Sequence, residues 1–264
     1  MVEFPDVPDP AATGGGFELI CEIEPPTRPD LMHVRHQIGV LSKVASGFLI
    51  PDNHLGRATV SSIAVAHEVA RMGGRSIACI NARDRNLLGF RRDLLTASAY
   101  GVDEFLFVHG DVPVSGVRSG GLSVKGMVAE ARGSAFGRPR VGLTTRLAPV
   151  PGWKLAADFL FVQVSFSLDA LLRWRESVDF AGPVYAGVLV LSSAAMARKL
   201  AADVDEIDIP PEWIAGVERD RMAAVERACD LTVAIRDSGA FAGVHLVPVA
   251  RYREVAARLE AALS

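Results

Sequence analysis

Acidic, amide and cationic side chains follow several short apolar runs of this sequence. Glu22 closes the first run, and Gln163 follows a later one. Asp111 lies in a His-Gly-Asp turn, Asn53 in a Pro-Asp-Asn turn, and Arg251 follows the last run. Carboxylates accept hydrogen bonds from ring N–H groups, an amide donates or accepts them, and an arginine binds a carboxylate through two parallel bonds. Together these residues suit a heteroaromatic ligand that carries an anionic tail.

Each of these residues also has a purely structural interpretation. A glutamate at the end of a strand is more often a solvated rim residue than a catalytic acid, and Asn53 has the residue type of an Asx turn. We interpret His109 and His245 as structural histidines rather than bases. Composition and spacing alone therefore predict a small-molecule enzyme and leave its reaction open.

The elements that must position these residues alternate between strand and helix along the chain. Eight apolar runs predict strands at 17–23, 47–50, 76–80, 104–108, 140–144, 158–162, 184–191 and 244–249. Helical periodicity predicts helices at 29–41, 58–72, 87–100, 124–131, 168–180, 194–202, 220–238 and 252–263, with an insertion at 209–217. Repeated strand–helix units indicate a parallel sheet, and eight of them in 264 residues predict a single-domain α/β fold, a (β/α)₈ TIM barrel.

A doubly wound open sheet is the competing architecture. Such a fold binds dinucleotides through a glycine-rich turn after its first strand. Here the first strand is followed by Glu24-Pro25-Pro26, which offers no glycine for close approach of a pyrophosphate. The barrel is therefore favoured, and in a barrel the polar residues at the carboxyl ends of the strands form the active site.

Composition restricts the partners. The net charge is −3 and there is no dense basic run, so we expect neither nucleic acid nor a membrane surface as a partner. Cys21, Cys79 and Cys229 are far apart and lack metal-ligand spacing, which indicates a reduced, cytoplasmic protein without a metal site. Residues 1–16 are expected to form a flexible lead to a barrel domain at 17–264. The sequence leaves open whether the chain forms a homo-oligomer.

Six motifs resemble, in order, those of the methylenetetrahydrofolate reductase family. They run from near residue 17 to the C-terminus, and each is weak alone. The motifs are Cys21-Glu22-Ile23-Glu24-Pro25-Pro26, Arg83-Asp84-Arg85-Asn86 with Asp93-Leu94-Leu95, His109-Gly110-Asp111-Val112-Pro113, Phe161-Val162-Gln163-Val164-Ser165-Phe166, Ile209-Pro210-Pro211-Glu212-Trp213, and Gly243-Val244-His245-Leu246 with Arg251.

The resemblance implies reduction of 5,10-methylenetetrahydrofolate to 5-methyltetrahydrofolate, a step in methionine biosynthesis, with NADH or NADPH as hydride donor. It implies that Glu22 supplies the proton that opens the folate ring and that Asp111 binds and stabilises the pterin. Gln163 would orient pterin or nicotinamide, and Arg251 would bind the glutamate tail. We also expect Asn53, from its place after the second strand, to bind substrate, and Phe166 and Asn81 to bind the cofactor, with Phe166 supplying a stacking face.

The residues that hold FAD in most of that family are changed here. Cys79-Ile80-Asn81-Ala82 replaces a His-x-Thr-Cys segment, and His109 replaces an arginine. About ten residues join the fifth and sixth strands, too few for an ordinary crossover helix. We therefore expect weak or no FAD binding and direct hydride transfer from the nicotinamide.

Three alternatives stay open. The first is the same reaction with a rearranged but functional FAD site. The second is a pterin-binding methyltransferase barrel, which would need no nicotinamide. The third is a barrel that only binds or regulates, against which the matching positions of Glu22, Asp111 and Gln163 argue.

Overall fold

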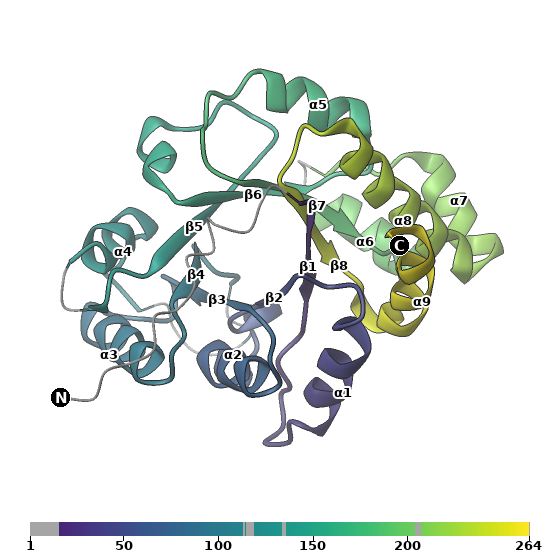
Figure 1. Ribbon diagram of the computed structural model, residues 1–264. Helices are drawn as coiled ribbons and strands as arrows, with labels where there is room; N and C mark the ends of the chain where they lie inside the picture. Colours follow the sequence, from purple (N-terminus) through teal and green to yellow (C-terminus); the bar gives the residue numbers. More distant parts are fainter. Residues whose placement is uncertain (1–15, 113, 115–118, 134–135, 204–206, 264) are drawn as a thin grey trace.

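Eight parallel strands close into one barrel in strand order 1 to 8, and helices surround it (Figure 1). The computed structural model describes residues 16–263 except 113, 115–118, 134–135 and 204–206. The strands are β1 (Glu18–Glu22), β2 (Gly47–Ile50), β3 (Ser76–Asn81), β4 (Glu104–Val108), β5 (Arg140–Thr145), β6 (Phe159–Val164), β7 (Val184–Leu189) and β8 (Gly243–Val247). The predicted single-domain (β/α)₈ TIM barrel is thus confirmed, whereas the predicted flexible lead falls almost wholly on residues 1–15, outside the described residues.

The helices run between the strands on the outside of the barrel (Figure 1). The α-helices are α1 (Met32–Leu41), α2 (Ser62–Arg71), α3 (Leu87–Ala99), α4 (Val124–Ala131), α5 (Leu168–Glu176), α6 (Ala194–Asp203), α7 (Pro211–Arg219), α8 (Arg221–Ser238) and α9 (Tyr252–Leu263). Short 3₁₀ helices are η2 (His54–Gly56), η4 (Gly152–Ala156) and η5 (Val249–Arg251). Side chains of Asn86, Ser123, Ser167 and Asp220 accept a backbone N–H at the starts of four helices, as N-cap residues do.

The barrel interior is packed with side chains. Alternate residues of each strand point to opposite faces, so one set fills the barrel and the other set meets the helices. The inner cluster consists of Ile20, Leu49, Ile77, Cys79, Leu106, Phe159, Phe161 and Tyr185. Because this layer leaves no open pore, a ligand must bind at one end of the barrel.

Charged residues occupy the amino-terminal end of the barrel. The Arg75 guanidinium donates to Glu18 at 2.6 Å and to Glu104 at 2.7 Å, and Arg140 donates to Glu104 at 3.1 Å. Tyr185 donates its hydroxyl to Glu18, and burial, followed by this bond, raises the pKa of that hydroxyl. The hydrogen-bonding groups of these side chains pair with one another. We therefore assign a structural role to this end of the barrel.

The structure departs from the predicted elements around α2 and α7 and agrees with them in the β5–β6 crossover. The helix predicted at 58–72 begins at Ser62, because the backbone N–H of Val60 bonds instead to the Pro26 carbonyl at 2.9 Å. The insertion at 209–217 is a helix, α7, anchored by buried Trp213. The crossover between β5 and β6 contains only η4, as the short spacing predicts.

Candidate active site

The carboxyl ends of the strands bring the predicted site residues to one mouth of the barrel. Glu22 ends β1, Gln163 lies one residue before the end of β6, and Asp111 follows β4. In the closed order, β4 and β6 each lie three strands from β1, on opposite sides around the ring. The three residues therefore come from well-separated positions around the same opening.

Glu22 is paired with a histidine on the neighbouring strand. Its Oε2 atom lies 3.1 Å from Nε2 of His245, and the two side chains are 15% and 13% exposed. The edge of the His245 ring contacts Phe161, with ring centroids 5.2 Å apart and planes at 66°. Phe161 in turn stacks on Tyr185 at 4.9 Å. The packed interior of the barrel thus supports the pair from below.

Asp111 joins two loops at the rim. Its Oδ2 atom accepts the backbone N–H of Leu55 at 2.8 Å, and the backbone N–H of Val114 bonds to the carbonyl of Gly56 at 2.9 Å. These contacts connect the loop after β2 to the loop after β4. One carboxylate oxygen of Asp111 thus accepts a hydrogen bond from the backbone. The side chain stays exposed at the rim, where a ligand can reach it.

Asn81 is buried, and both the nitrogen and the oxygen of its amide are hydrogen-bonded. The amide nitrogen donates to Asp52 at 2.8 Å and to Asp84 at 3.0 Å, and the amide oxygen accepts the Asp84 backbone N–H at 2.9 Å. Arg85 pairs with Asp52 across the same network. Gly110 (φ +91°) packs against Asn81, and a Cβ there would lie 2.8 Å from the Asn81 Cβ. Asn81 therefore organises the loops after β2, β3 and β4, and its predicted cofactor contact stays a prediction.

Asn53 takes the left-handed backbone conformation (φ 49°, ψ 46°) expected of a turn asparagine. Its amide nitrogen donates to Asp84 at 2.9 Å, and its amide oxygen accepts the Thr59 backbone N–H at 3.3 Å. The nitrogen and the oxygen of the Asn53 amide are thus both hydrogen-bonded within the rim. The predicted contact of Asn53 with substrate is untested.

Gln163 lies at an irregularity of the sheet. The register between β6 and β7 shifts between Phe161 and Val164, which adds one residue to β6. Gly187 on β7 makes this possible, because a Cβ there would lie 2.6 Å from the Val162 carbonyl oxygen and 2.8 Å from the Val164 nitrogen. Bulges of this kind re-aim side chains next to active sites.

Arg251 and Phe166 have partners within the chain. Arg251 follows β8 in η5 and donates to Glu254 at 3.0 Å, with 23% of its side chain exposed. The pair lies at the rim and joins residues only three apart, so a ligand carboxylate can compete with Glu254 for the guanidinium. Phe166 is buried with its ring against Trp213, centroids 4.9 Å apart at 71°. Its predicted stacking on a cofactor is untested.

The segment that joins β5 and β6 is held in place by hydrogen bonds to the end of β5 and to α5. Lys154 in η4 donates to the Thr144 carbonyl at 2.7 Å and lies over the Trp153 ring. Burial, followed by the nearby Arg146 charge, lowers the pKa of the Lys154 ammonium. Trp174 on α5 donates to the Ala148 carbonyl at 2.9 Å. This segment has no helix whose N-terminus could hold a pyrophosphate.

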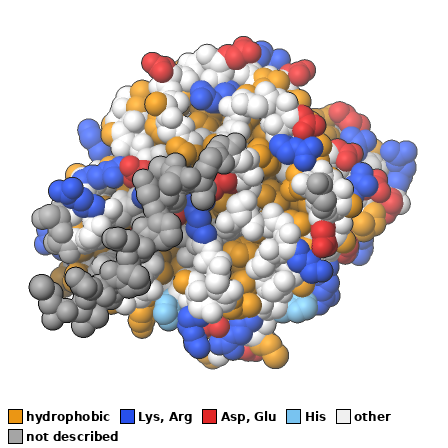
Figure 2. Space-filling model, viewed as in Figure 1, with side chains coloured by type: hydrophobic (Ala, Val, Ile, Leu, Met, Phe, Trp, Pro, Cys, Tyr) orange, Lys and Arg blue, Asp and Glu red, His pale blue; other side chains and the backbone are white. Residues whose placement is uncertain are grey.

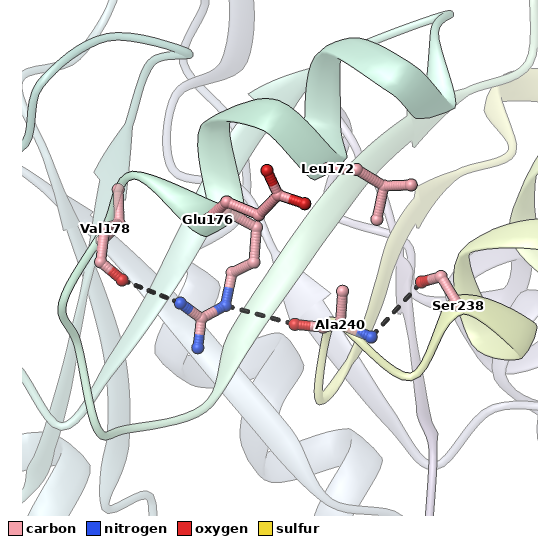
Figure 3. Close-up of a pocket in the computed structure, with 6 residues that line it drawn as sticks. Leu172, Glu176, Val178, Ser238 and Ala240 are labelled. Carbon is pink, nitrogen blue, oxygen red and sulfur yellow. Dashed lines mark hydrogen bonds between the residues drawn. The ribbon is translucent and has the colours of Figure 1, made fainter.

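A hollow of about 670 Å³ lies at the other end of the barrel (Figure 3). It is lined by the carboxyl ends of α5 and α8, which lead into β7 and β8. Within it the Arg175 guanidinium donates to the carbonyls of Ala240 and Val178 at 3.2 and 2.9 Å. These bonds hold two helix-to-strand loops together, so we assign the hollow to structure and not to the reaction.

Two further kinds of group, metal ligands and thiols, bear on what the described residues can do. No cluster of three or more His, Cys, Asp or Glu residues that could hold a metal ion occurs among them. The three cysteines are buried and unpaired, and burial raises the pKa of the Cys21 thiol to about 12. Such thiols are not reactive nucleophiles.

Basic and acidic side chains are interspersed on the face shown in Figure 2, where the described residues form no continuous basic patch. In the described part of the chain, no helix has the length and apolar character needed to cross a membrane. The predicted absence of a nucleic-acid partner and the predicted cytoplasmic location are not tested by these observations.

Comparisons with known proteins find structures of similar fold but no match to the sequence among protein families or curated proteins. No protein-family model matches the sequence, and no curated protein matches it at a significant level. An uncharacterized protein from Clostridium thermocellum, which binds two copies of 5-methyl-5,6,7,8-tetrahydrofolic acid, matches with a TM-score of 0.65 at 11% identity, over 93% of this chain and 95% of that one. At this identity the likeness shows the barrel fold alone.

Two enzymes match less closely. The Bacillus cereus spore cortex-lytic enzyme SleL has a TM-score of 0.56 at 10% identity, over 92% of this chain and 74% of that one. EDTA monooxygenase (EmoA) from Chelativorans sp. BNC1 has a TM-score of 0.54 at 9% identity, over 94% and 93%. These matches add nothing on ligand or reaction, since barrels of one fold perform many reactions.

His245 is the site residue that sequence reasoning missed. We interpreted it as structural, because nothing in the sequence pairs it with Glu22, which lies 223 residues away. The available signal was its position in the final strand, since the first and last strands of a closed barrel are neighbours.

Proposed function

We propose that this chain is a methylenetetrahydrofolate reductase that uses NADH or NADPH directly. The observation that carries the proposal is the mostly buried Glu22, held by His245, at a mouth that Asp111 and Gln163 also border. Folate binding by a structural neighbour of the same fold adds support, because that barrel accepts the same class of ligand.

The reaction needs one proton and one hydride. Protonation of N10 of 5,10-methylenetetrahydrofolate breaks its bond to the methylene carbon and leaves an iminium at N5. A hydride from C4 of the reduced nicotinamide then adds to that carbon, which gives 5-methyltetrahydrofolate and NAD(P)⁺. Glu22 is the proton donor, since it is mostly shielded from water and held by an imidazole, whereas the buried Asp52 at the same end is paired with the permanent charge of Arg85.

The other rim residues bind and orient the substrate. Asp111 has one carboxylate oxygen free of the Leu55 contact, so it can accept pterin N–H bonds and stabilise positive charge on the ring. Gln163 orients pterin or nicotinamide from the bulge of β6. Arg251 exchanges Glu254 for the glutamate tail of folate. Asn53 acts through the rim turn that it holds.

Features of the described chain argue against a resident FAD. The β5–β6 crossover is bonded to its own barrel through Lys154 and Trp174, and both hydrogens of the buried Asn81 amide are already donated, to Asp52 and Asp84. The residues present do not fit that group. Nicotinamide and pterin must therefore lie face to face, with donor and acceptor carbons about 3–3.5 Å apart.

Anaerobic mixing of the purified chain with reduced nicotinamide and 5,10-methylenetetrahydrofolate tests the proposal. Loss of nicotinamide absorbance without added FAD is the expected result. Turnover only after FAD is added would favour the flavin-dependent version of the reaction. Tight folate binding without any oxidation of nicotinamide would favour a pterin-binding methyltransferase barrel and would overturn the reductase.

A further inference from the structure

Thr144 differs in exposure from every other residue of the barrel strands. The eight strands lie wholly within the described residues, and all their other members are buried or half-buried, whereas Thr144 is exposed. It lies one residue before the end of β5, at the carboxyl end of the barrel. A polar side chain therefore remains open to solvent at the end of the barrel where Glu22 and Gln163 also lie.

Thr144 points into the barrel and not toward the helices. Gly142, two residues earlier, faces the interior, because a Cβ there would overlap the ring of Phe159, a member of the inner cluster. Side chains two residues apart on a strand share a face. On β6, the partner of Thr144 in the ladder is Phe161, which also belongs to that cluster. An inward-facing residue can be exposed only where the packed interior ends, so Thr144 borders the mouth.

The Thr144 hydroxyl is available to a ligand. Among the described residues it has no hydrogen-bond partner, whereas the hydroxyls of Thr145, Ser165 and Ser193, near the ends of β5, β6 and β7, all bond within the chain. The backbone at Thr144 is fixed, since Nζ of Lys154 donates to its carbonyl at 2.7 Å. A β-branched side chain is also restricted at χ1. This hydroxyl therefore has little freedom to lose when a ligand binds.

The carboxylates of the mouth lie on one half of it. They lie at or after the ends of β1 to β4, as Glu22, Asp52, Asp84 and Asp111. The loops that lead from β5, β6 and β7 to the next helix contain no carboxylate. A pterin has several N–H donors and develops positive charge during the reaction, so it fits the acidic half. The other half is left for the nicotinamide, whose carboxamide needs neutral hydrogen-bonding partners.

We propose that the reduced nicotinamide binds over the ends of β5 and β6 and that its carboxamide is held by the Thr144 hydroxyl. This inference rests on the proposed reductase function, for which it gives the place of the hydride donor. A hydroxyl can donate to the carboxamide oxygen or accept from the carboxamide nitrogen. Because β5 lies four strands from β1 in the closed order, the nicotinamide reaches the folate from the side opposite Glu22.

The first test is a titration of NADH fluorescence with Thr144→Val and Thr144→Ser. Valine keeps the shape of threonine and removes the hydroxyl, so the Kd for NADH is expected to rise about three- to tenfold, the effect of one uncharged hydrogen bond. Serine keeps the hydroxyl, and its Kd stays near that of the wild type. The Kd for 5-methyltetrahydrofolate, measured by calorimetry, is expected to be unchanged in both variants.

Thr96→Val is the matched control. Thr96 lies on α3, outside the barrel, and its hydroxyl donates to the Arg92 carbonyl at 2.8 Å. Its replacement leaves the Kd for NADH unchanged. If Thr144→Val bound NADH as tightly as a wild-type chain that reduces methylene-folate, the nicotinamide site would be wrong and the proposed function would stand. A loss of folate affinity in place of NADH affinity would assign Thr144 to the pterin and also overturn the inference.

The second test uses the wild-type chain. With methyl-labelled threonine, the Thr144 methyl group is expected to show a nuclear Overhauser effect to the nicotinamide ring protons of bound NADH. Thr144→Ser lacks this methyl group and so identifies its signal. Saturation with NADH without such an effect would refute the site. The effect in a chain that transfers no hydride to methylene-folate would support the site and contradict the reductase.

Discussion

Gly187 makes a close approach to the β6 bulge, and replacing it with alanine tests whether that bulge positions Gln163. The added Cβ would lie 2.6 Å from the Val162 carbonyl oxygen, 2.8 Å from the Val164 nitrogen and 3.0 Å from the Gln163 carbonyl carbon. All three are backbone atoms, so no side chain can rotate away. The bulge itself must shift.

Two effects of Gly187→Ala follow from this displacement. Overpacking of this kind costs about 1–3 kcal/mol, which is the expected loss in the free energy of unfolding. A displacement approaching 1 Å at a positioning residue lowers kcat/KM by up to about 100-fold. Urea denaturation measures the first effect, and steady-state oxidation of nicotinamide with methylene-folate measures the second.

Gly39 on α1 provides the control, because a Cβ there meets no atom within 4 Å. Gly39→Ala is expected to stabilise the helix by up to about 1 kcal/mol and to leave turnover unchanged. If Gly187→Ala matched the wild type in both stability and kcat/KM, the bulge would not be what positions Gln163.

Three further substitutions probe separate parts of the site. Glu22→Gln is expected to lower kcat at least 100-fold and to change the folate Kd little, measured by turnover and by calorimetry; an equal loss of binding would contradict its role as acid. Arg251→Ala is expected to weaken folate binding about tenfold without affecting a pterin that lacks the glutamate tail, and equal weakening of both ligands would exclude tail recognition. Asp52→Asn removes one of the two carboxylates that pair with Arg85 and leaves Asp93 at 2.6 Å, so the free energy of unfolding should fall by about 1.5–3 kcal/mol in urea titrations, and a change below about 1 kcal/mol would mean that the network is not structural.

The strands were predictable because each is a short apolar run bounded by polar or glycine residues. The observed β2 and β4 coincide with their predicted ranges, whereas β7 ends at Leu189, two residues before the predicted end. Residues 190 and 191 are buried apolar residues beyond the ladder, and apolar periodicity cannot separate these from strand residues.

The helix predicted to begin at residue 58 shows a different limit. Its alanine-rich pattern is helical, but the Thr59 backbone N–H bonds to the Asn53 side chain and the Val60 N–H bonds to the Pro26 carbonyl. Tertiary contacts of this kind override local propensity. The same limit applies to Asn81: its predicted cofactor contact stays a prediction, and its bonds to Asp52 and Asp84 depend on tertiary contacts that the sequence does not show.

The positions of Glu22, Asp111 and Gln163 at strand ends could be read from the sequence, since each follows an apolar run. Their partners could not. The neighbour of Glu22 is determined by closure of β8 onto β1, and the setting of Gln163 is determined by the bulge that Gly187 permits. Both depend on contacts between distant parts of the chain.

In the proposed reaction, hydride passes directly from the nicotinamide to the folate at the mouth bordered by Glu22. The most direct measurement follows deuterium from nicotinamide labelled at the transferable C4 position, in the absence of FAD. Direct transfer predicts that one deuterium is retained in the methyl group of 5-methyltetrahydrofolate. A methyl group without deuterium, or no product until FAD is supplied, would contradict it.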